Sequence, residues 1–415
     1  MDALSMSMAG RPQAADIRPE AAGAPTSGIV EVMSHGRGRP GLIPLYVGEG
    51  DLPTPAFITE AAHRSLQAGD TFYTWQRGIP ELREALARYH AGLYGGVFDP
   101  DRFSVTVGGM HAAQIAIRIA AGMGDEVLIP TPSWPNFDGA VTISGATPVS
   151  VPMSVGQDGW HLDIDRLGAA VTPRTRAMVI NSPANPTGWT AGREELAAIL
   201  GVARRHGLWI VAGEIYGRFV HGPGLLAGTG RSPSFRDVME PDDHVMFVQT
   251  FSKNWAMTGW RIGWLEAPVQ LGPVIENLVQ YSTSGVAGFL QKGGVTALDE
   301  GEPFVADQIA RARRGREVVC EGLRATNVVD LSAPPGAFYA FFRVDGVTDT
   351  RRLALDLIDR ANVGLAPGSA FGQGGERHLR LCFLRRSEDL EEAVRRLAAV
   401  LPALAVEAAS AGSAR

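Results

Sequence analysis

The stretch HVMFVQTFSKNWAMTGWRIGW, from His244 to Trp264, joins an apolar run to a turn that carries a lysine and an arginine. The apolar run predicts a buried strand, and Lys253 follows it among aromatic and other apolar residues. Desolvation in such surroundings disfavours the ammonium form, which lowers the pKa of a lysine and makes it an imine-forming nucleophile. Taken alone, Lys253 would more often be an ordinary surface lysine.

Arg261 changes that interpretation. It lies eight residues after Lys253, and Gly259 and Gly263 flank it. A guanidinium group can hold a phosphate there, while small residues let the backbone approach it. A nucleophilic lysine and a phosphate-binding arginine together predict a cofactor with an aldehyde and a phosphate, namely pyridoxal 5′-phosphate on a Schiff-base lysine.

Outward from this stretch, short apolar runs alternate with helical patterns. SVTVGG precedes MHAAQIAIRIAAGMG, and the amphipathic segment REELAAILGVARRHG precedes LWIVAG. This alternation predicts an α/β fold, with a mostly parallel sheet flanked by helices. Ligands bind at the carboxyl ends of the strands in such sheets, and the unusual residues of this chain follow those ends.

The pattern changes near residue 311, where a long basic helix is followed by GAFYAFFRV, a helix and RHLRLCFL. We expect a smaller α+β domain formed by residues 29–47 and 311–415, and a large cofactor-binding domain from 48 to 310. Residues 1–28 are rich in Ala, Gly, Ser, Pro and Met, which predicts a flexible N-terminal arm.

The composition narrows the classes of function. The chain has 415 residues, and its net charge of −6 gives no reason to expect nucleic acid or an anionic membrane as a partner. No apolar run reaches the roughly 20 residues of a membrane span. Two cysteines argue against a disulfide framework and against a thiolate metal site, and they favour a reducing cytoplasm. We therefore predict no metal.

The segment SKNWAMTGWRIGW closely resembles the lysine motif of the class I/II pyridoxal-phosphate-dependent aminotransferases of fold type I, the aspartate-aminotransferase-like enzymes. The resemblance extends from about residue 40 to about residue 395, and its motifs occur in the family's order. It implies that Lys253 forms the Schiff base and that Arg261 binds the phosphate. It also implies an enzyme that moves an amino group between an L-amino acid and a 2-oxo acid.

Three further motifs concern the substrate and the subunit partner. LYVGEGDLPTP resembles the family segment whose glycine contacts the substrate carboxylate, which implies Gly48 in this role. FYTWQRGIPELREAL resembles the segment whose tyrosine reaches the phosphate of the neighbouring subunit, which implies a homodimer with Tyr73 acting in trans. RHLRLCFL implies that Arg380 clamps the substrate α-carboxylate as a bidentate pair. Taken singly, Gly48 would more often be an ordinary turn and Tyr73 a packing residue.

The cofactor phosphate has a second expected ligand group in TVGGMHAAQIAI, where a glycine pair opens a helix. Helix N-termini expose unpaired N–H groups and partial positive charge, so they bind phosphate. We assign Gly109, Met110 and His111 to this cradle, mainly through their backbone. The resemblance adds the hydroxyls of Thr250 and Ser252, of which Thr250 better matches the family position.

Residues around the cofactor ring are implied by three motifs. PTPSWPNF places Trp134 where the family stacks an aromatic side chain on the ring. In NSPANPTG and EIYGRF, the resemblance implies that Asn185 and Tyr216 donate hydrogen bonds to the phenolic oxygen of the cofactor. A buried core tryptophan and a common Asx-Pro turn are the alternative interpretations of the first two motifs.

The chain departs from the family at Gly213, in WIVAGEIYGRF. The family has an aspartate there, whose carboxylate pairs with the pyridine nitrogen. Glu214 is a poor substitute, because successive side chains of a strand point to opposite faces. Three explanations are open: a substitution in this chain, a weakened electron sink for restricted chemistry, or cofactor binding with little turnover.

Other enzymes on the same fold are the main alternatives to an aminotransferase. They are a lyase that acts by β-elimination and an amino-acid oxidase, and a third alternative is a cofactor-binding protein. Side-chain specificity is expected from residues near Gly48 and from the partner subunit, with Trp75, Gln76 and Arg77 as candidates.

Overall fold

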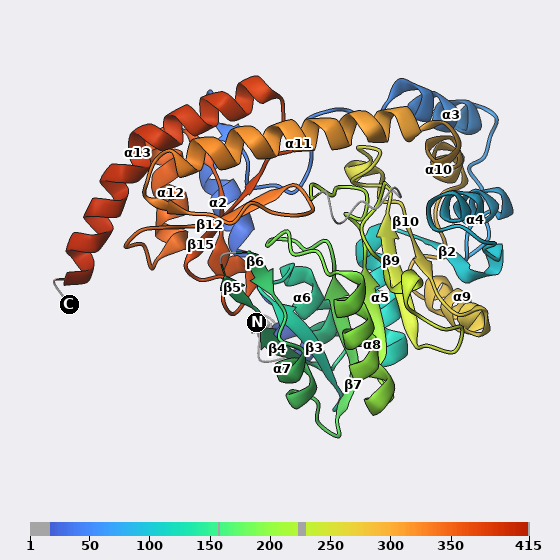
Figure 1. Cartoon of the computed structure of the whole chain (residues 1–415). Helices are drawn as coiled ribbons and strands as arrows, with labels where there is room; N and C mark the ends of the chain where they lie inside the picture. Colours follow the sequence, from blue (N-terminus) through green and yellow to red (C-terminus); the bar gives the residue numbers. More distant parts are fainter. Residues whose placement is uncertain (1–16, 157, 223–229, 414–415) are drawn as a thin grey trace, which may run out of the picture.

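The computed structural model describes residues 17–156, 158–222 and 230–413, and a seven-stranded sheet forms the centre of the larger part (Figure 1). Its strand order is β2–β10–β9–β8–β7–β3–β4. The pairs from β9 to β4 are parallel, and β10 is antiparallel to both of its neighbours. The predicted α/β class with a mostly parallel sheet is therefore confirmed. The strands are β2 (Phe103–Thr106), β3 (Glu126–Thr131), β4 (Thr147–Pro152), β7 (Thr175–Asn181), β8 (Trp209–Gly213), β9 (Val245–Thr250) and β10 (Gly263–Glu266).

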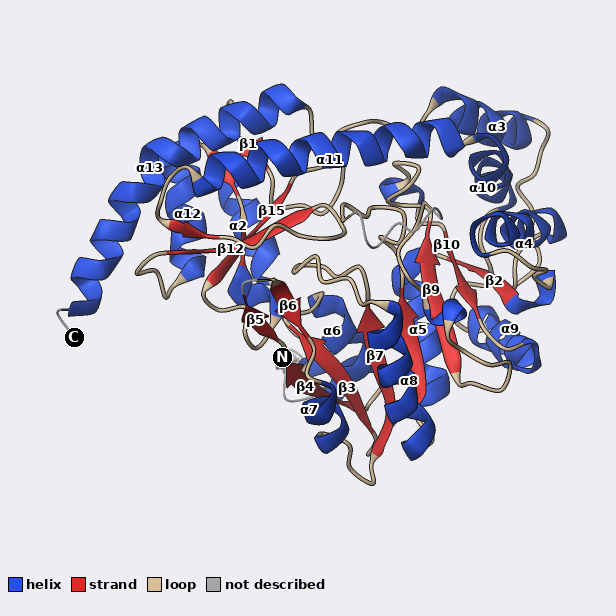
Figure 2. Cartoon of the chain, viewed as in Figure 1, coloured by secondary structure: helices blue, strands red, loops and turns tan. Residues whose placement is uncertain are grey.

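Helices cover both faces of this sheet (Figure 2). The connections from β2 to β3 and from β3 to β4 run one way along the sheet, and the connection from β7 to β8 runs the other way. Because crossovers between parallel strands are right-handed, the two directions place their helices on opposite faces. Accordingly, α5 contacts α6, and α7 contacts α8. These helices are α5 (Gly108–Ala120), α6 (Pro135–Ile143), α7 (Ile164–Ala169) and α8 (Arg193–His206).

A second, antiparallel sheet has the order β11–β12–β15–β14. The short strand β1 (Ile43–Pro44) pairs in parallel with β13 (Val363–Gly364), so the segment near residue 44 lies beside the C-terminal part of the chain. Helix α11 runs from this region to α10 beside the larger sheet (Figure 1). The other elements of this part are α2 (Gly28–Gly36), α11 (Glu302–Arg324), β11 (Val329–Asp330), β12 (Tyr339–Val344), α12 (Thr350–Ala361), β14 (Ala366–Pro367), β15 (His378–Cys382) and α13 (Ser387–Ser413).

The domain limits at residues 28, 47 and 310 stay a prediction. Residues 1–16 of the expected arm lie outside the described residues, and the short helix α1 (Pro19–Ala22) contacts α6. None of the helices in the described ranges is long and apolar enough to cross a membrane. The remaining elements are α3 (Ala56–Gln67), α4 (Pro80–Tyr94), β5 (Ser154–Gly156), β6 (Gly159–His161), α9 (Gly272–Gln280) and α10 (Gly288–Glu300).

The parallel strands bring their carboxyl ends to one edge of the larger sheet. These ends are Thr131, Asn181, Gly213 and Thr250, on β3, β7, β8 and β9. Strands β8 and β9 are almost wholly buried, as expected for strands that are covered on both faces. The polar residues that follow the strand ends therefore meet next to the smaller sheet.

Candidate active site

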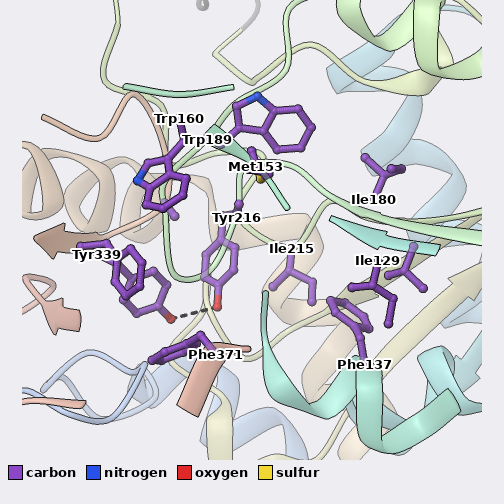
Figure 3. Packing of buried hydrophobic residues seen from close by; sticks show 14 of the residues in the cluster. Ile129, Phe137, Met153, Trp160, Ile180, Trp189, Ile215, Tyr216, Tyr339 and Phe371 are labelled. Atoms are coloured by element: carbon purple, nitrogen blue, oxygen red, sulfur yellow. Dashed lines mark hydrogen bonds between the residues drawn. The ribbon is translucent and has the colours of Figure 1, made fainter. Parts of the chain in front are cut away.

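A cavity of about 400 Å³ lies at these strand ends. Figure 3 shows part of the packing around it, with Phe137, Ile215 and Tyr216 from the larger part and Tyr339 and Phe371 from the smaller. Most of the residues predicted for the site line this cavity. They are Gly48, Gly109, Met110, Trp134, Asn185, Tyr216, Thr250, Ser252, Lys253, Arg261 and Arg380.

Lys253 follows the end of β9 and reaches the cavity with its amine. Its Nζ donates a hydrogen bond to the carbonyl oxygen of Gly48 at 2.8 Å. Desolvation by burial lowers the pKa of Lys253 to about 8, and the Arg380 and Arg261 cations act in the same direction. An amine with this pKa is partly unprotonated near neutral pH, so it can attack a carbonyl carbon.

Arg261 faces the N-terminus of α5 closely enough that a side chain would not fit between them. A Cβ added at Gly108 would lie 2.5 Å from Arg261 Nη2, and Gly108 has a φ of +75°. The hydroxyls of Thr250 and Ser252 lie 2.9 Å apart on the same side of the cavity. These groups form an anion-binding site, which consists of the unpaired N–H groups at the start of α5, one guanidinium and two hydroxyls.

Arg380, on β15, is buried, with an exposed fraction of 3%, and hydrogen bonds hold its guanidinium in place. Its Nη1 donates to Asn185 Oδ1 at 2.9 Å, and its Nη2 donates to the carbonyl of Tyr46. The guanidinium also lies over the rings of Tyr339 and Phe371, at 4.7 and 4.8 Å from their centroids. Its Nε has no partner. A buried cation with an unused donor, at the wall of a cavity, is suited to binding a carboxylate.

Tyr216 was predicted from the sequence, whereas its neighbour Tyr339 was not. The two hydroxyl oxygens lie 2.9 Å apart (Figure 3). Burial raises the pKa of Tyr216 to about 12 and that of Tyr339 well above its usual value, so both phenols are protonated donors at neutral pH. Tyr339 lies in the apolar stretch GAFYAFFRV, where only its hydroxyl distinguishes it from the neighbouring phenylalanines.

Trp134 is partly buried beside the cavity and packs edge-on against Phe137, with ring centroids 5.3 Å apart. Asn181, at the end of β7, and Ile29 and Met33, on α2, also line the cavity and were not predicted. No motif signals α2, because its position over the cavity depends on the folding of distant parts of the chain.

Glu214 does not replace the missing carboxylate. Its oxygens accept hydrogen bonds from Ser234 Oγ at 2.7 and 2.9 Å, from the backbone of Phe235 at 3.1 Å and from Arg236 at 2.8 Å. Arg236 also pairs with Glu266. The Glu214 side chain therefore belongs to a buried network on the other side of β8, as the alternation of a strand predicts.

Three predicted residues do not place a side chain in the cavity. Gly213 has none. The His111 imidazole accepts a hydrogen bond from the Val107 N–H and lies 2.9 Å from Ser282 Oγ, so only its backbone is near the anion site. Tyr73 is 95% exposed on the surface.

Among the candidates for side-chain specificity, Arg77 is held within its own chain. Its Nε donates to Ser104 Oγ at 3.1 Å, and its Nη2 donates to the carbonyl of Asp101. Trp75, by contrast, is 66% exposed. Arg77 therefore contacts β2 and its surroundings, and it does not line the cavity.

The chain has a mostly parallel sheet beside a smaller antiparallel sheet, with a desolvated lysine at the strand ends. This combination places it among the transferases of fold type I. Residues 40–397 match the aminotransferase class I and II family. The chain belongs to this family.

The relatives of the chain are aminotransferases with different named substrates. A probable aspartate/prephenate aminotransferase of Aquifex aeolicus is 35% identical, over 84% of this chain and 88% of the relative. An aromatic-amino-acid aminotransferase of Thermococcus litoralis is 33% identical, over 90% of this chain and 95% of the relative. Among solved structures, a single mutant of Thermus thermophilus aspartate aminotransferase has a TM-score of 0.85 at 32% identity, covering 93% of this chain and 99% of that chain.

Proposed function

We propose that this aminotransferase works with pyridoxal 5′-phosphate bound through Lys253, and that it transfers the amino group of an L-amino acid to a 2-oxo acid. The observation that carries the proposal is the position of the Lys253 amine, in one cavity with the anion site at α5 and the buried guanidinium of Arg380. The cofactor supplies an aldehyde for the amine and an electron-withdrawing ring.

The residues of the cavity suit the parts of this cofactor. The absence of a side chain at Gly108 leaves room for the Arg261 guanidinium beside the N-terminus of α5, and this suits a phosphate. The aromatic side chain of Trp134 offers a face to a ring, and the protonated phenol of Tyr216 offers a hydrogen bond to its phenolic oxygen. Asn185 has its Oδ1 engaged by Arg380, so its amide nitrogen is the donor that remains for that oxygen.

The substrate contacts follow from the same geometry. The free Nε and the fork of Arg380 suit the α-carboxylate of an amino acid. The backbone of Gly48 is held close to the lysine by the bond from Nζ. With the carboxylate held by Arg380, the Lys253 amine would be the group that takes the proton from the substrate Cα.

We also propose a homodimer in which Tyr73 completes the phosphate site of the partner subunit. Phe72, Tyr73 and Tyr281 are 86%, 95% and 89% exposed, and the segment of residues 75–76 lies against the segment 280–285 through a hydrogen bond between Gln76 and Gln280 at 2.8 Å. An aromatic patch of this kind on a soluble surface marks an interface. Tyr73→Ala should weaken dimerisation in sedimentation velocity, whereas Met123→Ala, at another exposed site, should not.

The two cysteines, Cys320 and Cys382, are both free and buried. We propose the cytoplasm as the compartment, because unpaired thiols persist in a reducing environment.

The decisive experiment is reconstitution of the purified protein with pyridoxal 5′-phosphate. We expect a visible absorbance band that an L-amino acid bleaches and a 2-oxo acid restores. Lys253→Ala should abolish the band, while Lys292→Ala, which removes an exposed lysine paired with Glu81, should leave it unchanged. A wild-type protein without the band at excess cofactor would refute the proposal.

A further inference from the structure

The end of β8 carries no side chain beside the floor of the cavity, because Gly213 stands there. Gly213 pairs in register with Asn181 of β7. A Cβ added at Gly213 would have the Cζ of Phe137 at 3.3 Å and the Nδ2 of Asn181 at 3.4 Å as its nearest neighbours. Both Phe137 and Asn181 line the cavity. A side chain at position 213 would therefore point to this floor, between an aromatic ring and an amide.

The hydrogen bonds of Asn181 fix the orientation of its amide. Nδ2 donates to the carbonyl of Gly213 at 2.8 Å and lies 3.3 Å from the carbonyl of Pro183, while Oδ1 accepts from the Asn185 N–H at 3.1 Å. A flipped amide would set an oxygen against two carbonyls and an NH₂ group against an N–H. The polar side-chain atom next to Gly213 is therefore a neutral amide nitrogen whose hydrogens are already engaged.

No carboxylate among the described residues supplies a charge at this floor. Glu214 points into the network with Ser234 and Arg236. Asp138, which follows Phe137, does not line the cavity. Glu49 is the acidic residue in the described lining, and it lies at the Lys253 side, where its charge acts on that amine.

We propose that the floor formed by Gly213, Asn181 and Phe137 gives the pyridine nitrogen of the cofactor no counter-charge, so that this nitrogen stays unprotonated. The inference rests on the proposed cofactor. A pyridinium ion buried without a counter-charge is disfavoured by desolvation. The ring then withdraws electrons more weakly, because charge near the ring nitrogen tunes the electronics of the cofactor.

The proposal is tested by ¹⁵N NMR of the wild-type holoenzyme, reconstituted with cofactor labelled at the ring nitrogen. We expect the chemical shift of a neutral pyridine, independent of pH across the neutral range. Gly213→Asp places a carboxylate at this floor and should move the signal to that of a pyridinium. Gly192→Asp is the matched control, since a Cβ at Gly192 meets nothing within 4 Å, and it should leave the signal unchanged. A pyridinium signal in the wild type would overturn the inference.

A second measurement covers the case in which Gly213→Asp folds poorly. A cofactor analogue with a C–H group in place of the ring nitrogen should bind the wild type as tightly as the natural cofactor. About tenfold weaker binding of the analogue, the loss expected for a charge-assisted hydrogen bond, would contradict the inference.

The two proposals fail in different ways. If the labelled cofactor shows no bound signal, the cofactor proposal fails and this inference falls with it. If the cofactor binds to Lys253 with a protonated ring nitrogen, only the inference about Gly213 and Asn181 fails.

Discussion

Replacing Arg380 by lysine should remove most of the transition-state stabilisation that depends on the substrate α-carboxylate. The guanidinium donates to Asn185 Oδ1 at 2.9 Å and to the Tyr46 carbonyl. Its Nε remains free to donate to a third acceptor. A lysine has its donors on one nitrogen, so it cannot serve both acceptors and also form a fork with a carboxylate.

The magnitude follows from these contacts. A hydrogen bond to a charged group contributes about 1.5–3 kcal/mol, and loss of the bidentate pair removes up to two such bonds to the carboxylate. The lower ends for the two bonds sum to about 3 kcal/mol, and each 1.36 kcal/mol is a factor of ten in rate. We therefore expect Arg380→Lys to lower kcat/KM by about a hundredfold or more.

The assay is the single-turnover bleaching of the visible band by increasing concentrations of an amino acid. An amine donor without a carboxylate should react equally with wild type and variant, which separates loss of the clamp from general damage to the site. Arg377→Lys, three residues earlier and exposed, serves as the matched control and should keep the wild-type rate. An unchanged kcat/KM in Arg380→Lys would refute the assignment of this residue.

Four other predictions concern the strand ends and the interface. Gly213→Asp should speed the half-reaction by about ten- to a hundredfold, the equivalent of about 1.5–3 kcal/mol for a charge-assisted bond; equal rates in stopped-flow traces would show that the ring nitrogen does not limit the reaction. The same variant should lose about 1 kcal/mol of unfolding free energy in urea titrations, because Phe137 and Asn181 must yield to the new Cβ at 3.3 and 3.4 Å. Since burial lowers the pKa of Lys253 to about 8, capture of cofactor by the apoprotein should quicken as the pH rises through about 8 and then level off; a rate still climbing well above that pH would mean an unperturbed lysine. A mixture of Tyr73→Ala and Lys253→Ala subunits should regain activity that neither variant has alone, because the mixed dimer holds one site with both residues; no recovery would mean that Tyr73 acts within its own chain.

Local sequence patterns were sufficient to predict the larger sheet. Buried strands such as LWIVAG and HVMFVQT are continuous apolar runs, and REELAAILGVARRHG ends at Gly207, whose φ of +64° caps α8. Both signals depend on neighbours in the sequence. The alternation of strand and helix then fixes parallel pairing and opposite faces through the handedness of the crossovers.

The residues that motifs do not mark could not be predicted in the same way. Tyr339 and Asn181 enter the site through pairing of distant strands, and Ile29 and Met33 enter through the docking of α2 over the cavity. Such contacts depend on tertiary packing. The direction of Glu214, however, followed from strand alternation alone, and the structure shows its carboxylate among Ser234, Phe235 and Arg236.

The most direct test of the aminotransferase mechanism is the product balance of one turnover without a 2-oxo acid acceptor. The holoenzyme is mixed with excess L-amino acid, and 2-oxo acid, ammonia and the aminated cofactor are quantified. We predict one equivalent of 2-oxo acid and one of aminated cofactor per active site, with no free ammonia, and then no further reaction until a 2-oxo acid is added. Continuous release of ammonia with the oxo acid would contradict this account and identify a lyase or an oxidase.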